Sequence, residues 1–282
     1  MKVLVTGYRG QLGWEVVRLL EARGIPCRGV DQDDFDLTKP ADVLAYVRAY
    51  VPDVIVHCAA YTNVDKAETE PEICAAVNAM GTLHMVRAAL SVGAKMVYIS
   101  TDYVFPGTGD TPYDIGDPYG PKNVYGVSKV QGEDAVRSLV KRFFILRTSW
   151  VFGKHGNNFV RTMLRLGAEK KELRVVSDQV GSPTYAVDLA RVICDMIPTE
   201  KYGIYHVRNE GFVSWAEFAA MIMDKAGLPC RIVPVPTSEY PALAKRPLNS
   251  RLNGSRLQES GFAPMPSVED ALDRFLAELN ED

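Results

Sequence analysis

Tyr125 and Lys129, four residues apart, are the side chains of this sequence with the clearest capacity for chemistry. On a helix this spacing puts both side chains on one face. A neighbouring ammonium favours the phenolate, so we expect Lys129 to lower the pKa of Tyr125 and to let the phenol exchange a proton near neutral pH. Alone the pair is a weak pattern, because most such pairs are ordinary surface neighbours.

Two other stretches strengthen the interpretation. A glycine-rich loop at residues 6–13 (TGYRGQLG) follows an apolar run at 2–5 and precedes a segment with helical apolar spacing. Ser100-Thr101-Asp102 ends a second apolar run, and Thr101 lies 24 residues before Tyr125. With these stretches, the Tyr–Lys pair becomes a candidate for proton transfer beside a bound nucleotide.

The glycine loop has the strand–turn–helix context of a dinucleotide-binding turn. Glycines permit the tight turn, and they let backbone N–H groups approach a pyrophosphate at the helix N-terminus. The spacing is Gly-x-x-Gly-x-x-Gly, through Gly7, Gly10 and Gly13, and so departs from Gly-x-Gly-x-x-Gly. For this segment alone, a glycine-rich turn without a ligand is the alternative.

Together these features resemble the extended branch of the short-chain dehydrogenase/reductase superfamily, which has a Thr-Gly-x-x-Gly-x-x-Gly loop and a Ser/Thr–Tyr–Lys catalytic set. Further segments look like signatures of one family in that branch, the dTDP-4-dehydrorhamnose reductases. They are residues 100–109 (STDYVFPGTG), 123–126 (NVYG), 146–153 (LRTSWVFG), 156–159 (GNNF), 178–184 (DQVGSPT) and 246–252 (RPLNSRL). The resemblance runs from residue 1 to about residue 275.

Strand-like and helix-like patterns alternate along the chain. In the first half, strands are expected at 2–6, 26–31, 54–60, 96–100 and 143–147, and helices at 11–23, about 38–50 with Thr38 as N-cap, 71–92 and 123–140. In the second half, helices are expected at 158–170, at 187–197, after a capping box at Ser214 and after a cap at Ser267. Strands are expected at 173–177, 202–207 and 231–236, the last as an edge strand or crossing segment. Such alternation predicts an α/β fold with a Rossmann-like, doubly wound parallel sheet.

The resemblance implies two parts. Residues 1–153 would form the NAD(P)-binding Rossmann domain, including the catalytic residues. Residues 154–282 would form mainly a smaller nucleotide-sugar-binding lobe, with some segments returning to the Rossmann domain.

Composition fits a globular protein: of 282 residues, 47% are hydrophobic and 24% charged, which suffices for a packed core. A net charge of −3 gives no electrostatic case for nucleic acid or an anionic membrane as a partner. We expect no apolar stretch of membrane-spanning length and no signal-peptide core. Five widely spaced cysteines without a Cys-x-x-Cys pair favour reduced thiols in a cytoplasmic protein.

The resemblance implies that NAD(P)H delivers a hydride to the C4 ketone of dTDP-4-dehydro-β-L-rhamnose, a step in dTDP-rhamnose and cell-surface polysaccharide biosynthesis. Tyr125 would donate a proton to the ketone oxygen, and Thr101 would hydrogen-bond that oxygen. Lys129 would tune Tyr125 and hold the ribose hydroxyls of the nicotinamide half. Ser100 is the weaker hydroxyl candidate, because strand alternation sends it to the opposite face.

Two residues give opposite indications about the cofactor. Asp31 follows the second strand, where a carboxylate would accept from the ribose 2′-hydroxyl of NAD. Arg9 lies in the glycine loop, where a guanidinium would pair with the 2′-phosphate of NADP, so we expect dual use of NADPH and NADH. Small residues at 59 and 60 fit either close approach of the cofactor or tight packing. The expected cofactor-binding set is Gly7, Arg9, Gly10, Gln11, Leu12, Gly13, Asp31, Asp36, Leu37, Ala59, Ala60, Tyr61, Tyr125 and Lys129.

Residues around the sugar rest on the resemblance. Trp150 would flank the sugar, with a core position as the alternative, and Arg246 would recognise the diphosphate unless it forms a surface ion pair. Glu15 matches an acidic position that some members use for a divalent cation such as Mg²⁺, but partner carboxylates lack clear spacing, so no metal site is assigned. The expected substrate-binding set is Thr62, Val64, Thr101, Asp102, Tyr103, Tyr125, Trp150, Asn158, Arg246 and Asn249.

Two other functions share these features. Relatives of the family serve as regulatory subunits of a methionine adenosyltransferase, but such a subunit is free to lose the Thr, Tyr or Lys, and this chain keeps all three. A nucleotide-sugar epimerase or dehydratase is the other alternative. Dehydratases add an acidic residue after the catalytic Thr, as Asp102 would be, but they usually have a Glu where this chain has Tyr103. We expect a monomer or a homodimer.

Overall fold

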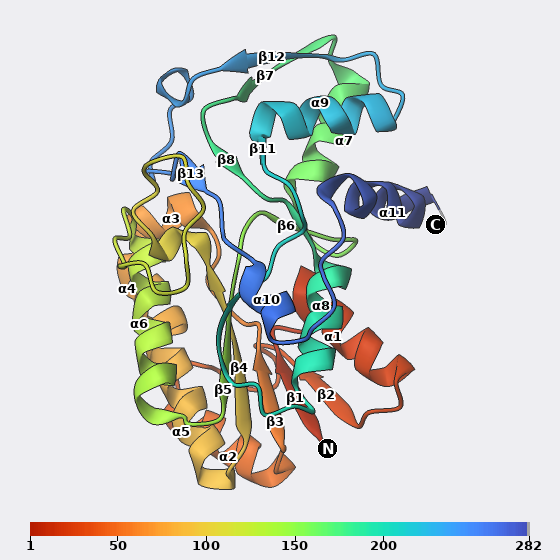
Figure 1. Ribbon diagram of the computed structural model, residues 1–282. Coiled ribbons are helices and arrows are strands. Elements are labelled where there is room, and N and C mark those ends of the chain that lie inside the picture. Colours follow the sequence, from red (N-terminus) through yellow and green to blue (C-terminus); the bar gives the residue numbers. More distant parts are fainter. Residues whose placement is uncertain (281–282) are drawn as a thin grey trace.

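In the computed structural model, which describes residues 1–280, a parallel sheet forms the centre of the lower part of the molecule (Figure 1). Its strands are β1 (Val3–Thr6), β2 (Cys27–Val30), β3 (Val54–His57), β4 (Lys95–Thr101), β5 (Phe143–Thr148) and β10 (Gly203–His206). They stand in the order β2-β1-β3-β4-β5-β10, with every neighbouring pair parallel. The expected doubly wound α/β fold is confirmed.

Helices cover both faces of this sheet, because both faces are apolar. The bounds are α1 (Gln11–Ala22) and α8 (Ala186–Met196) on one face, and α2 (Pro40–Tyr50), α5 (Thr82–Val92) and α6 (Val124–Leu139) on the other. Successive residues of a strand point to opposite faces. Val3 and Val5 therefore belong to the core under α1 and α8, and Leu4 belongs to the core under α2, α5 and α6.

One helical run on the second face is unusually long and apolar. α4 (Pro71–Ala75), the π-helical turn η1 (Ala76–Gly81) and α5 continue one another, which confirms the helix expected at 71–92 and adds a π-helical turn to it. By length and composition alone this 22-residue run could span a membrane, because an 18-residue window within it has a mean hydropathy of 1.3, so the expectation of no such stretch is wrong. Half of the window is buried in the fold and the run packs against α2 and α6, as a core helix does.

A third core lies at the top of Figure 1, away from the parallel sheet. It is built by α7 (Phe159–Glu169), β7 (Glu172–Val176), α9 (Trp215–Lys225), β12 (Arg231–Val235) and α11 (Val268–Asn280). β12 pairs with β7 in a two-stranded sheet, which confirms the expected edge strand. Phe152, Phe218 and Phe275 are buried in this core, and the Phe152 ring contacts both of the others.

The chain crosses between these regions repeatedly, since α8 and β10 return to the parallel sheet after α7 and β7. The remaining elements are α3 (Val64–Thr69), η2 (Asp102–Val104), β6 (Val151–Phe152), β8 (Val180–Gly181), β9 (Thr184–Tyr185), β11 (Val213–Ser214), η3 (Thr237–Glu239), β13 (Asn249–Ser250) and α10 (Ser255–Glu259). The division into domains at residue 153 stays a prediction.

Helix starts follow the expected signals with one exception. Ser214 and Glu217 form the capping box of α9, and Ser267 accepts a hydrogen bond from the Asp270 N–H at the start of α11. The N-cap expected at Thr38 is wrong, because α2 begins at Pro40 and the Thr38 hydroxyl donates to Asp36 instead. The fixed φ of proline at the first helical position starts this helix without a side-chain cap.

Candidate active site

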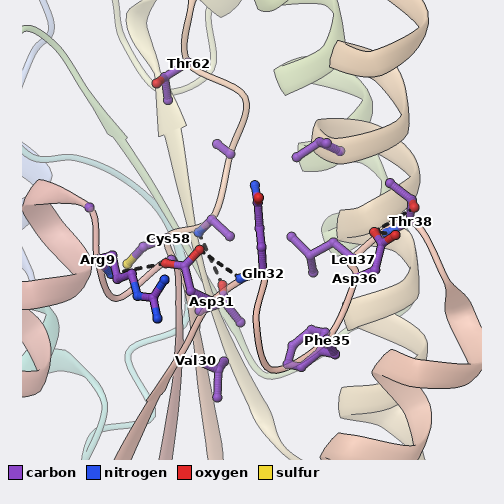
Figure 2. Close-up of a pocket in the computed structure, with 16 residues that line it drawn as sticks. Arg9, Val30, Asp31, Gln32, Phe35, Asp36, Leu37, Thr38, Cys58 and Thr62 are labelled. Carbon is purple, nitrogen blue, oxygen red and sulfur yellow. Dashed lines mark hydrogen bonds between the residues drawn. The ribbon is translucent and has the colours of Figure 1, made fainter. Parts of the chain in front are cut away.

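The glycine loop lies where the strand order reverses, with β1 between β2 and β3. In doubly wound sheets a crevice opens at such a point, beyond the carboxyl ends of the strands. A cavity of about 700 Å³ occupies this place, and Figure 2 shows side chains from the segments after β1, β2 and β3 pointing around it.

The loop is packed so tightly that only glycine fits. A Cβ at Gly13 would lie 2.2 Å from the carbonyl oxygen of Gly7, and one at Gly7, whose φ is +67°, would lie 2.7 Å from the backbone of Ala59. α1 begins directly after the loop, and its N-cap Gly10 makes no side-chain cap. The N–H groups of the first turn therefore have no side-chain acceptor at the N-cap, and this arrangement, next to a cavity lined by Gly7 and Gly10, fits the pyrophosphate of a dinucleotide.

Most of the expected cofactor residues border the cavity. These are Gly7, Arg9, Gly10, Asp31, Asp36, Leu37, Ala59 and Ala60. Three side chains point elsewhere: Gln11 reaches the Val151 carbonyl and Asn158, Leu12 lies in the core under α8, and the Tyr61 hydroxyl donates to Glu70 at 2.6 Å. In this arrangement these three residues would contact a dinucleotide only through their backbone atoms.

The two residues with opposite cofactor preferences lie side by side at the cavity edge (Figure 2). The Asp31 carboxylate accepts hydrogen bonds from the backbone N–H groups of Arg9 (3.2 Å) and Gln32 (2.9 Å). The Arg9 guanidinium pairs with Asp33 at 2.7 Å, and both side chains are largely exposed. Asp33 was not among the expected residues, and it competes with any phosphate for Arg9.

The catalytic candidates meet at the carboxyl end of β4 and on α6. Thr101 is the last residue of β4, and its hydroxyl lies close enough to that of Tyr125 to lower the pKa of the phenol. Tyr125 lies in the first turn of α6, which starts at N-cap Asn123. Lys129 follows one turn later with a side chain only 3% exposed, and its ammonium lies 4.1 Å from the centre of the Tyr98 ring.

Burial controls the protonation of this pair. It raises the pKa of Tyr125, with the Asp102 carboxylate adding to the rise and the Thr101 hydrogen bond opposing it. Burial also lowers the pKa of Lys129 to about 7, although the charge of Glu133 opposes the fall. The expectation that Lys129 lowers the pKa of Tyr125 is therefore wrong for this structure. Tyr125 keeps its proton at neutral pH, which is the form that a general acid requires.

Ser100 and Thr101 separate as strand alternation predicts. The Ser100 hydroxyl donates to Glu133 at 2.5 Å, farther along α6 than Tyr125. Glu133 in turn pairs with Arg147 at 2.7 Å, and both side chains are fully buried. This network joins β4, β5 and α6. Its one signal in the sequence is an arginine inside an otherwise apolar strand.

Several expected substrate residues gather next to the catalytic group. Tyr103 contacts Tyr125 edge to face at 5.6 Å, and Arg246 pairs with Asp65 and has its pKa raised by the nearby Tyr103. Asp102 is buried beside Thr101. Thr62 borders the cavity and Val64 begins α3.

Trp150 has a left-handed backbone, with φ +52°, and its indole stacks on Trp215 at 3.6 Å. It is half-buried, so the alternative of a simple core residue does not fit. Trp215 and Asp65 are partners that the sequence did not indicate.

Asn158 and Asn249, which were expected at the diphosphate of the substrate, have side-chain amides that hydrogen-bond within the chain, and their substrate contacts stay a prediction. Asn158 caps α7 and donates to the Gly153 carbonyl (2.8 Å) and to Gln11 (3.0 Å). Asn249 is 1% exposed, donates to the carbonyls of Thr108 and Thr111, and accepts from Arg251. Both amides are used in holding loops, because a buried amide must satisfy its own hydrogen bonds.

Glu15, the candidate for a divalent cation, is buried and paired with Arg18 at 2.7 Å. Within residues 1–280, no group of three or more His, Cys, Asp and Glu side chains is placed to hold a metal ion. The five cysteines are free thiols, and Cys74, Cys194 and Cys230 are buried.

Comparisons with known proteins agree with this geometry. The family model described as RmlD substrate binding domain matches residues 1–281. Spore coat polysaccharide biosynthesis protein SpsK of Bacillus subtilis is 43% identical over 98% of this chain and 97% of the relative. The dTDP-4-dehydrorhamnose reductase of Escherichia coli K12 is 41% identical over 99% of this chain and 98% of the relative.

Solved structures give the same result. A dTDP-4-dehydrorhamnose reductase from Bacillus anthracis in complex with NADP has a TM-score of 0.96 at 45% identity, covering 99% of this chain and 100% of that one. A UDP-glucose 4-epimerase from Thermus thermophilus has a TM-score of 0.82 at 22% identity and shares the fold. The resemblance found in the sequence is confirmed, and the chain belongs to the RmlD family, which includes the dTDP-4-dehydrorhamnose reductases.

Proposed function

We propose that this protein is an NAD(P)H-dependent dTDP-4-dehydrorhamnose reductase, which reduces the C4 ketone of dTDP-4-dehydro-β-L-rhamnose to dTDP-L-rhamnose. The observation that carries the proposal is the meeting of Thr101, Tyr125 and Lys129 beside a glycine-loop cavity, in a chain about 40% identical to reductases of that name. The pathway would be dTDP-rhamnose and cell-surface polysaccharide biosynthesis, and the enzyme would act in the cytoplasm as a monomer or homodimer.

The residues of the chain divide the work around the ketone oxygen. Bound NAD(P)H supplies the hydride. Tyr125, held protonated by burial, donates its proton to the oxygen as negative charge develops there. Thr101 hydrogen-bonds the same oxygen. Lys129 holds the ribose hydroxyls, and its pKa of about 7 means that its cationic form declines as the pH rises through neutrality.

Binding of the two substrates is assigned to the residues around this centre. The glycine loop and the first turn of α1 would bind the pyrophosphate of the cofactor, with Arg9 and Asp31 at the adenosine ribose. Trp150 and Tyr103 would flank the sugar, and Arg246 would face the diphosphate. Dual use of NADPH and NADH follows from the presence of both Arg9 and Asp31 at one edge of the cavity.

Turnover of dTDP-4-dehydro-L-rhamnose, followed as the loss of reduced-cofactor absorbance with NADPH and with NADH, tests the proposal. Tyr125→Phe is the matched control, because it keeps the ring and removes the proton donor. A non-catalytic nucleotide-binding subunit would bind cofactor without turnover. An epimerase or dehydratase would convert nucleotide sugars without net oxidation of the cofactor, and either result would refute the reductase assignment.

A further inference from the structure

We propose that Asp102 is a positioning residue for this reduction: protonated, it leaves the hydroxyl protons of Thr101 and Tyr125 free for the ketone, and ionised, it draws both away. The inference rests on the proposed function and assigns a protonation requirement to the same site. Three contacts of Thr101 carry it.

The Thr101 hydroxyl has one proton and two lone pairs to share. The backbone N–H of Tyr103 donates to its oxygen at 3.2 Å and takes one lone pair. The remaining lone pair and the single proton are shared between Asp102, whose Oδ1 lies 2.9 Å away, and the nearby phenol of Tyr125, whose pKa the Thr101 hydroxyl lowers. The direction of the two remaining hydrogen bonds is therefore set by whichever neighbour is unable to donate.

An ionised Asp102 is able only to accept. Thr101 must then give its proton to Oδ1, and the phenol of Tyr125 must donate to the lone pair that is left on Thr101. In that arrangement neither catalytic hydroxyl has a proton directed at the ketone oxygen. Turning Tyr125 toward the substrate would break its hydrogen bond with Thr101 in a buried setting, which costs free energy.

A protonated Asp102 reverses the direction of these hydrogen bonds. Its O–H donates to Thr101, the Thr101 proton turns to the ketone oxygen, and Tyr125 no longer has to donate to Thr101. The proton on Asp102 stays there throughout the reaction. The hydride from the cofactor and the proton from Tyr125 complete the alcohol, so the atoms and charges balance without a contribution from Asp102.

The surroundings of Asp102 raise the pH at which its carboxylate takes up a proton. The side chain is 2% exposed, and its Oδ2 has no hydrogen-bond partner among residues 1–280. The Ser250 hydroxyl faces this carboxyl from β13, but its oxygen is likewise without a completed hydrogen bond in the described part of the chain. Burial raises the pKa of Asp102 to about 6, against the lowering effects of Ser250, Thr101 and backbone N–H groups.

The other titratable groups around Asp102 also favour a neutral carboxyl during the reaction. Tyr103 and Tyr125 are both neutral phenols whose pKa values are raised, first by burial and then by the Asp102 charge. Arg246 is shared between Tyr103 and Asp65. Because the Asp102 charge opposes the tyrosinate that forms when Tyr125 gives up its proton, the neutral carboxyl also favours the chemical step.

Single-turnover hydride transfer, measured against pH for the wild type and Asp102→Asn, tests the proposal. Asparagine is nearly isosteric, stays neutral, and its amide N–H₂ donates to Thr101 as the protonated acid does. We expect the wild-type rate to fall about tenfold per pH unit above the pKa of Asp102. Asp102→Asn should lose that limb and exceed the wild type at high pH, while any limb due to Lys129 remains. A rate lowered equally at every pH would overturn the proposal, because it would indicate a merely structural role.

Two further measurements fix the cause. Because Asp102 acts through Thr101, adding Asp102→Asn to Thr101→Ala should not alter the pH profile. If Asp102→Asn alters the profile of Thr101→Ala as much as it alters that of the wild type, the mechanism is contradicted. Infrared difference spectra of wild type against Asp102→Asn, both with bound NADP, should show the C=O stretch of a carboxylic acid that disappears on titration. Absence of this band down to about pH 5 would refute the protonated state. The band can be observed without turnover. If it is present but the protein does not reduce the dTDP-sugar, the proposed substrate is refuted while the protonated state of Asp102 is supported.

Discussion

The two ends of the site use the same kinds of charged side chains in opposite surroundings. At the adenosine end, Arg9 and Asp33 are 58% and 72% exposed and form a direct ion pair at the surface. At the catalytic end, Asp102, Lys129 and Glu133 are at most 3% exposed. Exposed charges are screened and exchange partners at little cost, whereas buried ones must have each proton placed. The chain thus combines an adaptable nucleotide end with a rigid reacting end.

If this comparison is right, substitutions that change charge or hydrogen bonding should have large effects at the catalytic end. The same kinds of change should have small, salt-dependent effects at the adenosine end.

Tyr125→Phe should have the largest effect. The ring and its edge-to-face contact with Tyr103 remain, but the proton donor is gone. We expect turnover to fall by about a hundredfold or more, the usual range for a general acid, with cofactor dissociation constants little changed. Steady-state kinetics and cofactor titration measure both quantities. Turnover near that of the wild type would remove Tyr125 from the mechanism.

Lys129→Met should lower both turnover and cofactor affinity, because it removes the cation that holds the ribose hydroxyls. The affinity loss should be about tenfold or more, as for a hydrogen bond to a charged group, and the decline of activity caused by Lys129 losing its proton, near its pKa of about 7, should disappear. Isothermal titration of both cofactors and a pH–rate profile check these effects. If binding and profile both stay unchanged, Lys129 does not contact the cofactor.

The same substitution should stabilise the cofactor-free protein at low pH. The pKa of Lys129 is about 7 when folded against 10.5 as the ordinary value, so between these limits the unfolded chain binds more protons and stability rises with pH. Below about pH 7 the burial penalty acts in full. Melting curves should show a larger gain for Lys129→Met at about pH 6 than at about pH 9. A gain independent of pH would mean that packing and not charge is responsible.

Local patterns were sufficient for the fold and for the catalytic group. Alternating strand and helix periods gave the parallel sheet, and strand alternation put Ser100 and Thr101 on different partners. Helix spacing put Tyr125 and Lys129 on one helix, α6. These features depend on neighbours a few residues apart, so the sequence carries them directly.

Features that depend on long-range contacts could not be predicted. Arg246 pairs with Asp65 across 181 positions, and Ser250 faces Asp102 from a strand almost 150 positions away. The sign of the pKa shift at Tyr125 was missed for a related reason. The charge of Lys129 is a local feature, but the burial that outweighs it is created by several distant segments.

Asp31→Ala should have an intermediate effect at the adenosine end. The carboxylate holds the backbone N–H groups of Arg9 and Gln32 and would also accept from a ribose 2′-hydroxyl. Removal should weaken NADH by about tenfold and NADPH less, because a 2′-phosphate is relieved of a like charge. Asp31→Asn, which keeps one acceptor oxygen, is the matched control and should fall between. Equal losses for both cofactors would restrict Asp31 to holding the loop.

Arg9→Ala should have the smallest effect of the series and should be specific for NADPH. The guanidinium is exposed and already paired with Asp33, so its transfer to a 2′-phosphate exchanges one screened ion pair for another. We expect the NADPH dissociation constant to rise by less than about tenfold, less still at high salt, with NADH unaffected.

Asp33→Ala should act in the opposite direction, since it frees Arg9 for the phosphate. When Asp33→Ala is combined with Arg9→Ala, the gain in NADPH affinity should shrink to the general effect of removing one negative charge. If neither variant changes the ratio of the two dissociation constants, Arg9 does not reach the adenosine ribose, and discrimination lies in the segment after β2, where Gln32 and Phe35 border the cavity.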